Sequence, residues 1–272
     1  SRPARGGCRD AMIATESEAS VVEASVPPAS GAGDDSAVAP GPSSGVGDAR
    51  AGAAPRGAPG GPTWAHERQL GKWDCGPACT RMALRLAGVP VPPPHPDQAG
   101  GAPQWTIELL QELRDKGVDA SFTTDVLGVA ESHLDEPFYQ QHNIEHEAAN
   151  IRALFQRAAS EAWDVRTPRL DLEQLLSALS LGHPCIVLVD SRILANGEAG
   201  PRYSGHYIVA VGVRRCHVEG EGGGEREPPW WVQYLDPARE DGGLLEVPAP
   251  RLEEARAAEG TDGDVIEVMC TP

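Results

Sequence analysis

Residues 69–79 read QLGKWDCGPAC, and this stretch marks the start of the first long helix that the sequence predicts. Pro77 stands at the head of a run with apolar residues at helical spacing, and Gly88 ends that run. Proline is favoured in the first turn of a helix, and glycine is favoured just after its last turn. We therefore expect a helix over residues 76–88 with Cys75 at its N-terminus, where the helix dipole stabilises a thiolate.

Downstream of this helix, the remaining elements follow from periodicity and from Gly and Pro breaks. Helical spacing with terminal signals predicts helices at 106–116, 145–160, 171–181 and 251–258. Clusters of β-branched and aromatic residues predict strands at 120–124, 185–190, 206–213, 230–236 and 265–269. Because helices come mostly first and strands mostly last, this order favours an α+β domain over an alternating βαβ one.

Two segments have compositions that do not predict a packed structure. Residues 26–62 contain 29 Gly, Ala, Pro or Ser among 37, so we expect residues 1–62 to be a disordered tail. The stretch EGEGGGEREPP, residues 219–229, lies between two strand patterns and is expected to be a flexible acidic loop. Residues 63–272 have the size of one globular domain.

Charge and hydropathy exclude several classes of function. The chain has 23 Lys and Arg against 40 Asp and Glu, a formal charge of -17, so we expect no general nucleic-acid binding. No apolar run is long enough to cross a membrane, and the N-terminal residues lack the apolar core of a secretory signal. Six cysteines are too sparse for a disulfide scaffold. These features predict a cytoplasmic protein; they leave its oligomeric state open.

Two strands bring a histidine and a carboxylate toward the same end of a predicted hairpin. His206 opens the strand GHYIVAVG, and Asp236 closes the strand WWVQYLDPA. A symmetric antiparallel register would set residue 206 opposite residue 236 on one face of the sheet. Asp236 would then orient the imidazole of His206, and the other ring nitrogen would take a proton from a nucleophile.

Cys75 is the candidate nucleophile for this pair. Gln69 lies six residues upstream, and its side-chain N–H is expected to join the Cys75 backbone N–H in an oxyanion hole. Gly76 is expected to let a substrate backbone pass close to the sulfur. The predicted catalytic set is therefore Cys75, His206, Asp236 and Gln69, with no metal and no cofactor.

These residues carry a resemblance to known proteins. The order Gln, Cys, His, Asp, with WDCGPAC, GHYIVAVG and YLDPA, resembles the papain-like superfamily in the form of the bacteriocin leader peptidases. Over about residues 64–270 the domain looks most like the guanylyl cyclase domain-containing protein 1 family, named after a plant protein reported as a guanylyl cyclase. The resemblance implies a papain-like fold and a Cys-His-Asp site. The name of the family also implies a guanylyl cyclase activity.

Three functions follow as alternatives. The first is a cysteine hydrolase or acyltransferase acting on a peptide, isopeptide, amide or thioester bond. The second is a guanylate cyclase, although the chain has no Walker-type loop and only two lysines. The third is a catalytically silent module whose groove holds a peptide or protein partner.

Other polar residues are given structural interpretations. Cys79, one helical turn after Cys75, is expected to pack in the core, because no further ligand pair has zinc spacing. His133, His142 and His146 stand among acidic residues and are expected on a solvated surface.

Overall fold

The computed structural model describes residues 62–94, 103–140, 144–197, 203–215 and 229–270. The predicted disordered tail lies outside these ranges except for Pro62, which begins a short 3-10 helix, η1 (Pro62–Ala65). The predicted acidic loop also lies outside them apart from Pro229. Within the described residues, no helix is both long enough and apolar enough to cross a membrane.

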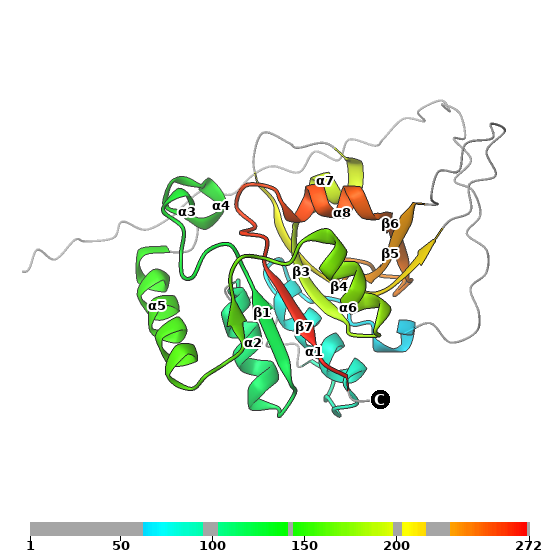
Figure 1. The fold of residues 1–272 in the computed structure, drawn as a ribbon, viewed down its shortest axis with the longest axis horizontal. Helices are drawn as coiled ribbons and strands as arrows, with labels where there is room; N and C mark the ends of the chain where they lie inside the picture. The colour runs from blue at the N-terminus through cyan, green and yellow to red at the C-terminus, as the bar shows by residue number, and fades with distance from the viewer. Residues whose placement is uncertain (1–61, 95–102, 141–143, 198–202, 216–228, 271–272) are drawn as a thin grey trace, which may run out of the picture. The chain divides into compact units, whose positions relative to one another are not determined.

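The domain is a mixed α+β structure built on one seven-stranded sheet (Figure 1), which confirms the predicted class. The described helices are α1 (Cys75–Leu86), α2 (Thr106–Asp115), α3 (Glu131–Asp135), α4 (Pro137–Gln140), α5 (Ile144–Ser160), α6 (Leu172–Ser180), α7 (Ser191–Asn196) and α8 (Ala249–Arg256). The strands are β1 (Ala120–Thr123), β2 (Val165–Arg166), β3 (Cys185–Asp190), β4 (Gly205–Arg215), β5 (Trp230–Leu235), β6 (Leu245–Pro248) and β7 (Val265–Val268). The papain-like assignment stays a prediction.

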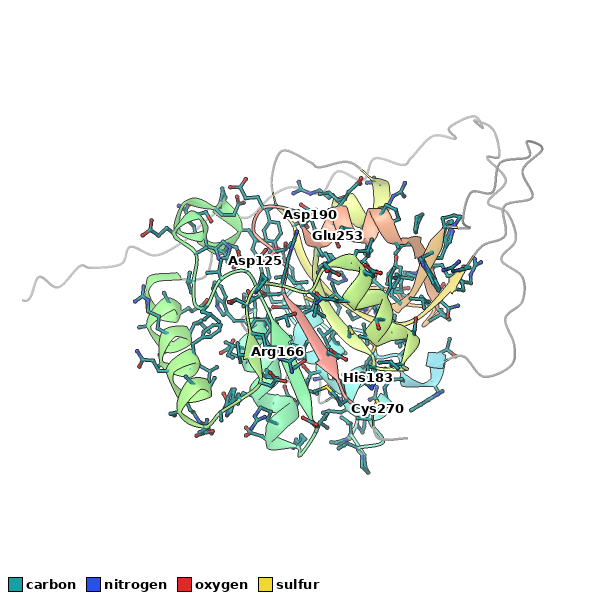
Figure 2. All side chains as sticks on the ribbon, viewed as in Figure 1. Asp125, Arg166, His183, Asp190, Glu253 and Cys270 are labelled. Atoms are coloured by element: carbon teal, nitrogen blue, oxygen red, sulfur yellow. The ribbon has the colours of Figure 1, made fainter. Side chains whose placement is uncertain are left out.

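The strand order places β3 and β4 near the middle of the sheet. The order is β2-β1-β7-β3-β4-β5-β6, and the pairs are antiparallel except for β1 with β2. Gly205 pairs with Asp190 and His206 with Val189, so His206 lies at the end of the sheet that Asp190 marks. Figure 2 shows Asp190 at that end and His183 with Cys270 toward the other.

Helices cover both faces of the sheet. One core contains side chains of α1, α2 and α5, among them Met82 of α1, and the other contains side chains of α6, α7 and α8, among them Leu252 of α8. Ile186 of β3 belongs to the first core, and the next residue, Val187, belongs to the second. This alternation explains why every residue of β3 is buried.

A buried ion-pair cluster ties the segment before α1 to the helix itself. Glu67 is 6% exposed and accepts hydrogen bonds from Arg81 and Arg85, both on α1. The neighbouring Ala65 is fully buried, and its carbonyl accepts a bond from Arg85 at 3.3 Å. The cluster fixes where the chain enters α1, and hence where Cys75 stands.

Glu67→Gln is expected to destabilise the domain by about 3 kcal/mol, because it leaves two partly buried guanidinium groups without their carboxylate. The matched change Glu240→Gln removes an exposed carboxylate that pairs with Arg68, and it should cost under about 1 kcal/mol. Urea unfolding of both variants measures the difference. Equal losses would show that the Glu67 cluster does not anchor the segment.

Candidate active site

Cys75 is the first residue of α1, as the sequence predicts, and its side chain is partly exposed. Asp74 precedes it and holds the entering loop, because its carboxylate accepts the backbone N–H groups of Leu70 at 2.6 Å and Gly71 at 2.8 Å. Asp74 is itself 6% exposed. The thiol therefore lies at a helix N-terminus whose approach is fixed by hydrogen bonds.

His206 and Asp236 meet, as predicted. The Nε2 of His206 lies 2.8 Å from Oδ1 of Asp236. The same carboxylate oxygen accepts the backbone N–H of Ala238 at 2.8 Å, and the Asp236 carbonyl accepts a hydrogen bond from His66 Nε2 at 2.9 Å. Asp236 is thus held in place from both its side chain and its backbone.

The strand register that brings them together differs from the predicted one. Residue 206 was expected opposite residue 236, but Val209 pairs with Leu235, and the register then shifts between Ala210 and Gly212. Continuing the Val209 pairing past the end of β5 would set residue 236 opposite residue 208, two positions from His206. Positions 206 and 208 share a face, so the two side chains meet as a diagonal pair. The expected register set residue 212 opposite residue 230, but β4 continues to Arg215, and it is Arg215 that pairs with Trp230. The one-residue shift between Ala210 and Gly212 then moves the position opposite residue 236 from 209 to 208, onto the face of His206.

The side chain of Cys75 also acts on His206 and helps to raise the pKa of the imidazole. Because Asp236 occupies Nε2, Nδ1 is the ring nitrogen left to face the thiol. Burial by itself would lower the pKa of His206, but the hydrogen bonds with Asp236 and Cys75 raise it to about 10. Burial would raise the pKa of Asp236, but the His206 hydrogen bond and charge lower it. The site therefore favours an imidazolium between a carboxylate and a sulfur.

The side chain of Gln69 already makes one hydrogen bond. Its Nε2 donates to the carbonyl of Gly71 at 2.8 Å, and its backbone N–H donates to Pro237 at 2.9 Å. The second bond ties the Gln69 backbone to the segment that carries Asp236. The Nε2 group has a second N–H, and its expected role in an oxyanion hole stays a prediction.

Gly76 has a packing role at the start of α1. It is buried, and a Cβ atom there would lie 3.1 Å from Leu109 of α2 and 3.4 Å from Tyr207 of β4. The glycine therefore allows α1 to pack closely on α2 and β4, and its expected role in letting a substrate backbone pass stays a prediction.

Cys75 and His206 open onto a pocket with about 740 Å³ of empty space, including the part open to solvent. Its walls combine aromatic side chains with carboxylates. The aromatic residues are Trp73, Trp105, Phe138, Tyr139, Tyr203 and Tyr207, and the acidic ones are Glu147, Asp262 and Asp264. Sequence reasoning missed nearly all of this wall, because α3 and α4 are too short to show a periodic pattern.

His133 also lines this pocket, contrary to the expected solvated position. It is 2% exposed, stacks on Tyr139 with ring centroids 4.4 Å apart, and lies 3.3 Å from Asp262. The side chains of His142 and His146 lie outside the described residues. Among the residues that the structure describes, no group of three or more His, Cys, Asp or Glu side chains is arranged to hold a metal ion.

Cys79 is fully buried in the core with α1 and α2, in keeping with the expected packing role. Burial raises the pKa of its thiol well above the ordinary value, and the nearby Cys75 and Asp236 charges add to the effect. It provides an internal comparison for Cys75 one turn away on the same helix.

Comparison with known proteins places this domain in a family. Residues 64–268 match the family described as guanylylate cyclase, which covers most of the described structure. The chain is also similar to a protein of Arabidopsis thaliana named Guanylyl cyclase 1. The two are 26% identical over 216 residues, which is 74% of this chain and 73% of the relative. The chain, with Cys75 on α1, His206 on β4 and Asp236 just after β5, belongs to the guanylylate cyclase family.

Proposed function

We propose that the domain is a papain-like cysteine hydrolase or acyltransferase acting on a peptide, isopeptide, other amide or thioester bond. The observation that carries the proposal is the arrangement of His206, with Asp236 at 2.8 Å on one ring nitrogen and Cys75 in the same pocket, where its side chain raises the pKa of the ring. Cys75 is the nucleophile, His206 the general base and acid, and Asp236 the group that orients the ring.

The chemistry proceeds in two halves. The Cys75 thiolate attacks the substrate carbonyl carbon, a C–S bond forms, and the carbonyl electrons move to its oxygen. When the oxyanion collapses, the bond to the leaving amine or thiol breaks, and the His206 imidazolium gives the leaving group its proton. The thioester that remains is attacked by water or an acceptor amine, which the neutral imidazole deprotonates, and Cys75 is released.

The developing oxyanion needs donors close to the sulfur. The first N–H groups of a helix have no partner within the helix, so the Cys75 N–H at the start of α1 is suited to this role. The free N–H of Gln69 is the second donor that we propose. Each such donor contributes about 3 kcal/mol to transition-state stabilisation in acyl transfer.

Competitive labelling tests the nucleophile. At pH 6, Cys75 is expected to react with iodoacetamide roughly a hundredfold faster than a free thiol, which is mostly protonated at that pH. Cys270 is the internal control, because burial raises the pKa of its partly exposed thiol. Mass spectrometry after brief labelling gives both rates in one sample. Equal labelling of Cys75 and Cys270 would exclude the proposed nucleophile.

The comparisons favour a second candidate, a guanylate cyclase. The family description and the name of the Arabidopsis relative support it. In the pocket, Asp262 and Asp264 are carboxylates of the type that bind divalent metal ions, and Lys72 is a basic group suited to a phosphate. In a cyclase, the purine of GTP would stack on the aromatic side chains of the pocket. In a hydrolase, a peptide would occupy the same pocket.

Cyclic GMP formation separates the two candidates. Purified protein with GTP and Mg²⁺ or Mn²⁺ is expected to form no more cyclic GMP than a Cys75→Ala, Asp236→Ala double variant. Metal-dependent product that survives this double change, and that is lost in Asp262→Asn, would replace the hydrolase proposal with the cyclase one. The assay therefore separates a reaction that needs Cys75 and Asp236 from one that needs the pocket carboxylate Asp262.

A further inference from the structure

The pocket beside Cys75 has a continuous aromatic wall. Trp105 and Tyr139 are stacked with ring centroids 5.2 Å apart, and Phe138 meets Tyr139 edge-on at 5.2 Å. Phe138 also meets Trp73 at 5.7 Å. The faces of aromatic rings carry partial negative charge and attract cations.

The same pocket contains a buried carboxylate with a vacant acceptor. Asp264 is 9% exposed, and its Oδ2 accepts the hydroxyl of Thr106. Its Oδ1 has no hydrogen-bond partner among the described residues. Burial raises the pKa of Asp264 to about 7, against the lowering effects of the Thr106 and Thr124 side chains. An ionised oxygen without a donor is costly at such a site, and a cationic donor would remove that cost.

The other two carboxylates of the pocket already have neighbours. Glu147 accepts the indole N–H of Trp105 at 3.1 Å, and Asp262 lies 3.3 Å from His133. Among the described lining residues, Lys72 is the single lysine or arginine, and its ammonium lies 4.3 Å from the centre of the Trp73 ring. One end of the wall therefore already holds an ammonium group, while Asp264 has none.

Hydrogen bonds connect Asp264 to the catalytic strand. Thr106 joins Asp264 to the hydroxyl of Tyr207, with 2.8 Å between the Thr106 and Tyr207 oxygens. Tyr207 directly follows His206 in β4. The vacant acceptor and the proposed nucleophile thus line the same pocket.

We propose that this pocket binds the basic side chain of a peptide substrate, with its ammonium or guanidinium group on Asp264 and its methylene stem along the aromatic wall. The inference rests on the proposed hydrolase function, for which it names the substrate class. It places the carbonyl of the basic residue beside Cys75.

Binding to the full chain carrying Cys75→Ala tests the pocket without catalysis. The probes are N-acetyl-lysine methylamide, the uncharged N-acetyl-norleucine methylamide of the same stem length, and guanosine, each titrated at pH 8 by NMR. The lysine probe is expected to bind at least about tenfold more tightly than the norleucine probe, the effect of one charge-assisted hydrogen bond. Equal affinity, or binding of guanosine alone, would overturn the inference.

Three variants assign the effect to Asp264. Asp264→Asn should remove most of the preference for the lysine probe, whereas Asp241→Asn, which removes an exposed carboxylate paired with Arg239, should keep it. Lys72→Met, at an exposed position, should strengthen binding of the lysine probe several-fold because it removes a competing charge. If Asp264→Asn does not fold, an unchanged affinity in Lys72→Met contradicts the proposal by itself.

Alkylation of the wild-type chain connects the pocket to Cys75. The chloromethyl ketones of N-acetyl-lysine and N-acetyl-norleucine react when a thiolate displaces chloride from the methylene carbon. Cys75 should react roughly tenfold faster with the lysine reagent. Lysine binding with an unreactive Cys75 would contradict the hydrolase proposal alone. A reactive Cys75 with no preference between the reagents would contradict the substrate class alone.

Discussion

His206→Ala is expected to slow alkylation of Cys75 by iodoacetamide at pH 6 by roughly a hundredfold, because a free thiol with an ordinary pKa is almost fully protonated at that pH. In the wild type, Asp236 stabilises the imidazolium of His206 in the pocket that Cys75 also lines, and a neighbouring cation activates a cysteine as a nucleophile. Without it, the helix N-terminus alone provides positive charge. The variant should regain reactivity only as the pH rises toward the pKa of an ordinary thiol.

His183 provides the matched control. It too is bonded to a carboxylate, with 2.7 Å between its Nδ1 and Oε1 of Glu267, but it lies at the other end of the sheet (Figure 2). His183→Ala should leave the alkylation rate of Cys75 unchanged. The measurement is the rate constant from pH 5 to pH 9 for both variants, with circular dichroism to establish folding. Similar rates in wild type and His206→Ala would mean that the imidazole does not activate the thiol.

Local sequence patterns predicted the parts of the site that lie on long elements. The proline and glycine signals around Cys75 indicated its helix start, and the apolar runs indicated β3 and β4. Each of these elements is several residues long and buried, so its periodicity is strong. The prediction that His206 and Asp236 share one end of a hairpin depended on these patterns alone, and the two side chains do meet.

The register could not be predicted from the same patterns. Strand β4 continues to Arg215, beyond the predicted end at residue 213, and Arg215 pairs with Trp230. A one-residue shift between Ala210 and Gly212 then changes the pairing again. Gly212 in the strand interior was the available signal, because glycine within a strand often marks a bulge. The predicted pairing of residue 206 with residue 236 assumed a strand without a bulge.

The pocket wall was hidden for a different reason. Tyr139 stands on a helix of four residues, and its hydroxyl donates to the carbonyl of Gly260 at 2.7 Å, across 121 positions in the sequence. Asp264 lies in a stretch of Gly, Asp and Thr that resembles a solvated turn, and it is buried because Thr106 of α2 packs against it. Such contacts come from tertiary structure and leave no local periodicity.

Asp236→Asn is expected to slow alkylation of Cys75 and to show strong non-additivity with His206→Ala. The asparagine keeps the volume of the side chain but loses the charge that stabilises the imidazolium, so the ring should activate Cys75 less. Once His206 is absent, Asp236 has no ring to orient. The double variant should therefore react no more slowly than His206→Ala alone.

The pair His183 and Glu267 provides the parallel cycle, because Glu267→Gln removes a carboxylate that also bonds a histidine. No member of that cycle should change the alkylation rate. Additive losses for His206 and Asp236 in folded variants would mean that the two residues affect Cys75 separately and do not form a catalytic unit.

Gln69→Ala distinguishes activation of the thiol from stabilisation of the oxyanion. Alkylation develops no oxyanion, so the variant should label like the wild type, whereas turnover of an acyl substrate should fall by roughly 100- to 1,000-fold. A lysine thioester is the substrate to use, because the pocket with Asp264 is proposed to bind its side chain. If alkylation and turnover fall together, the loss comes from the loop that the Gln69 backbone ties to Pro237, and the oxyanion role is wrong.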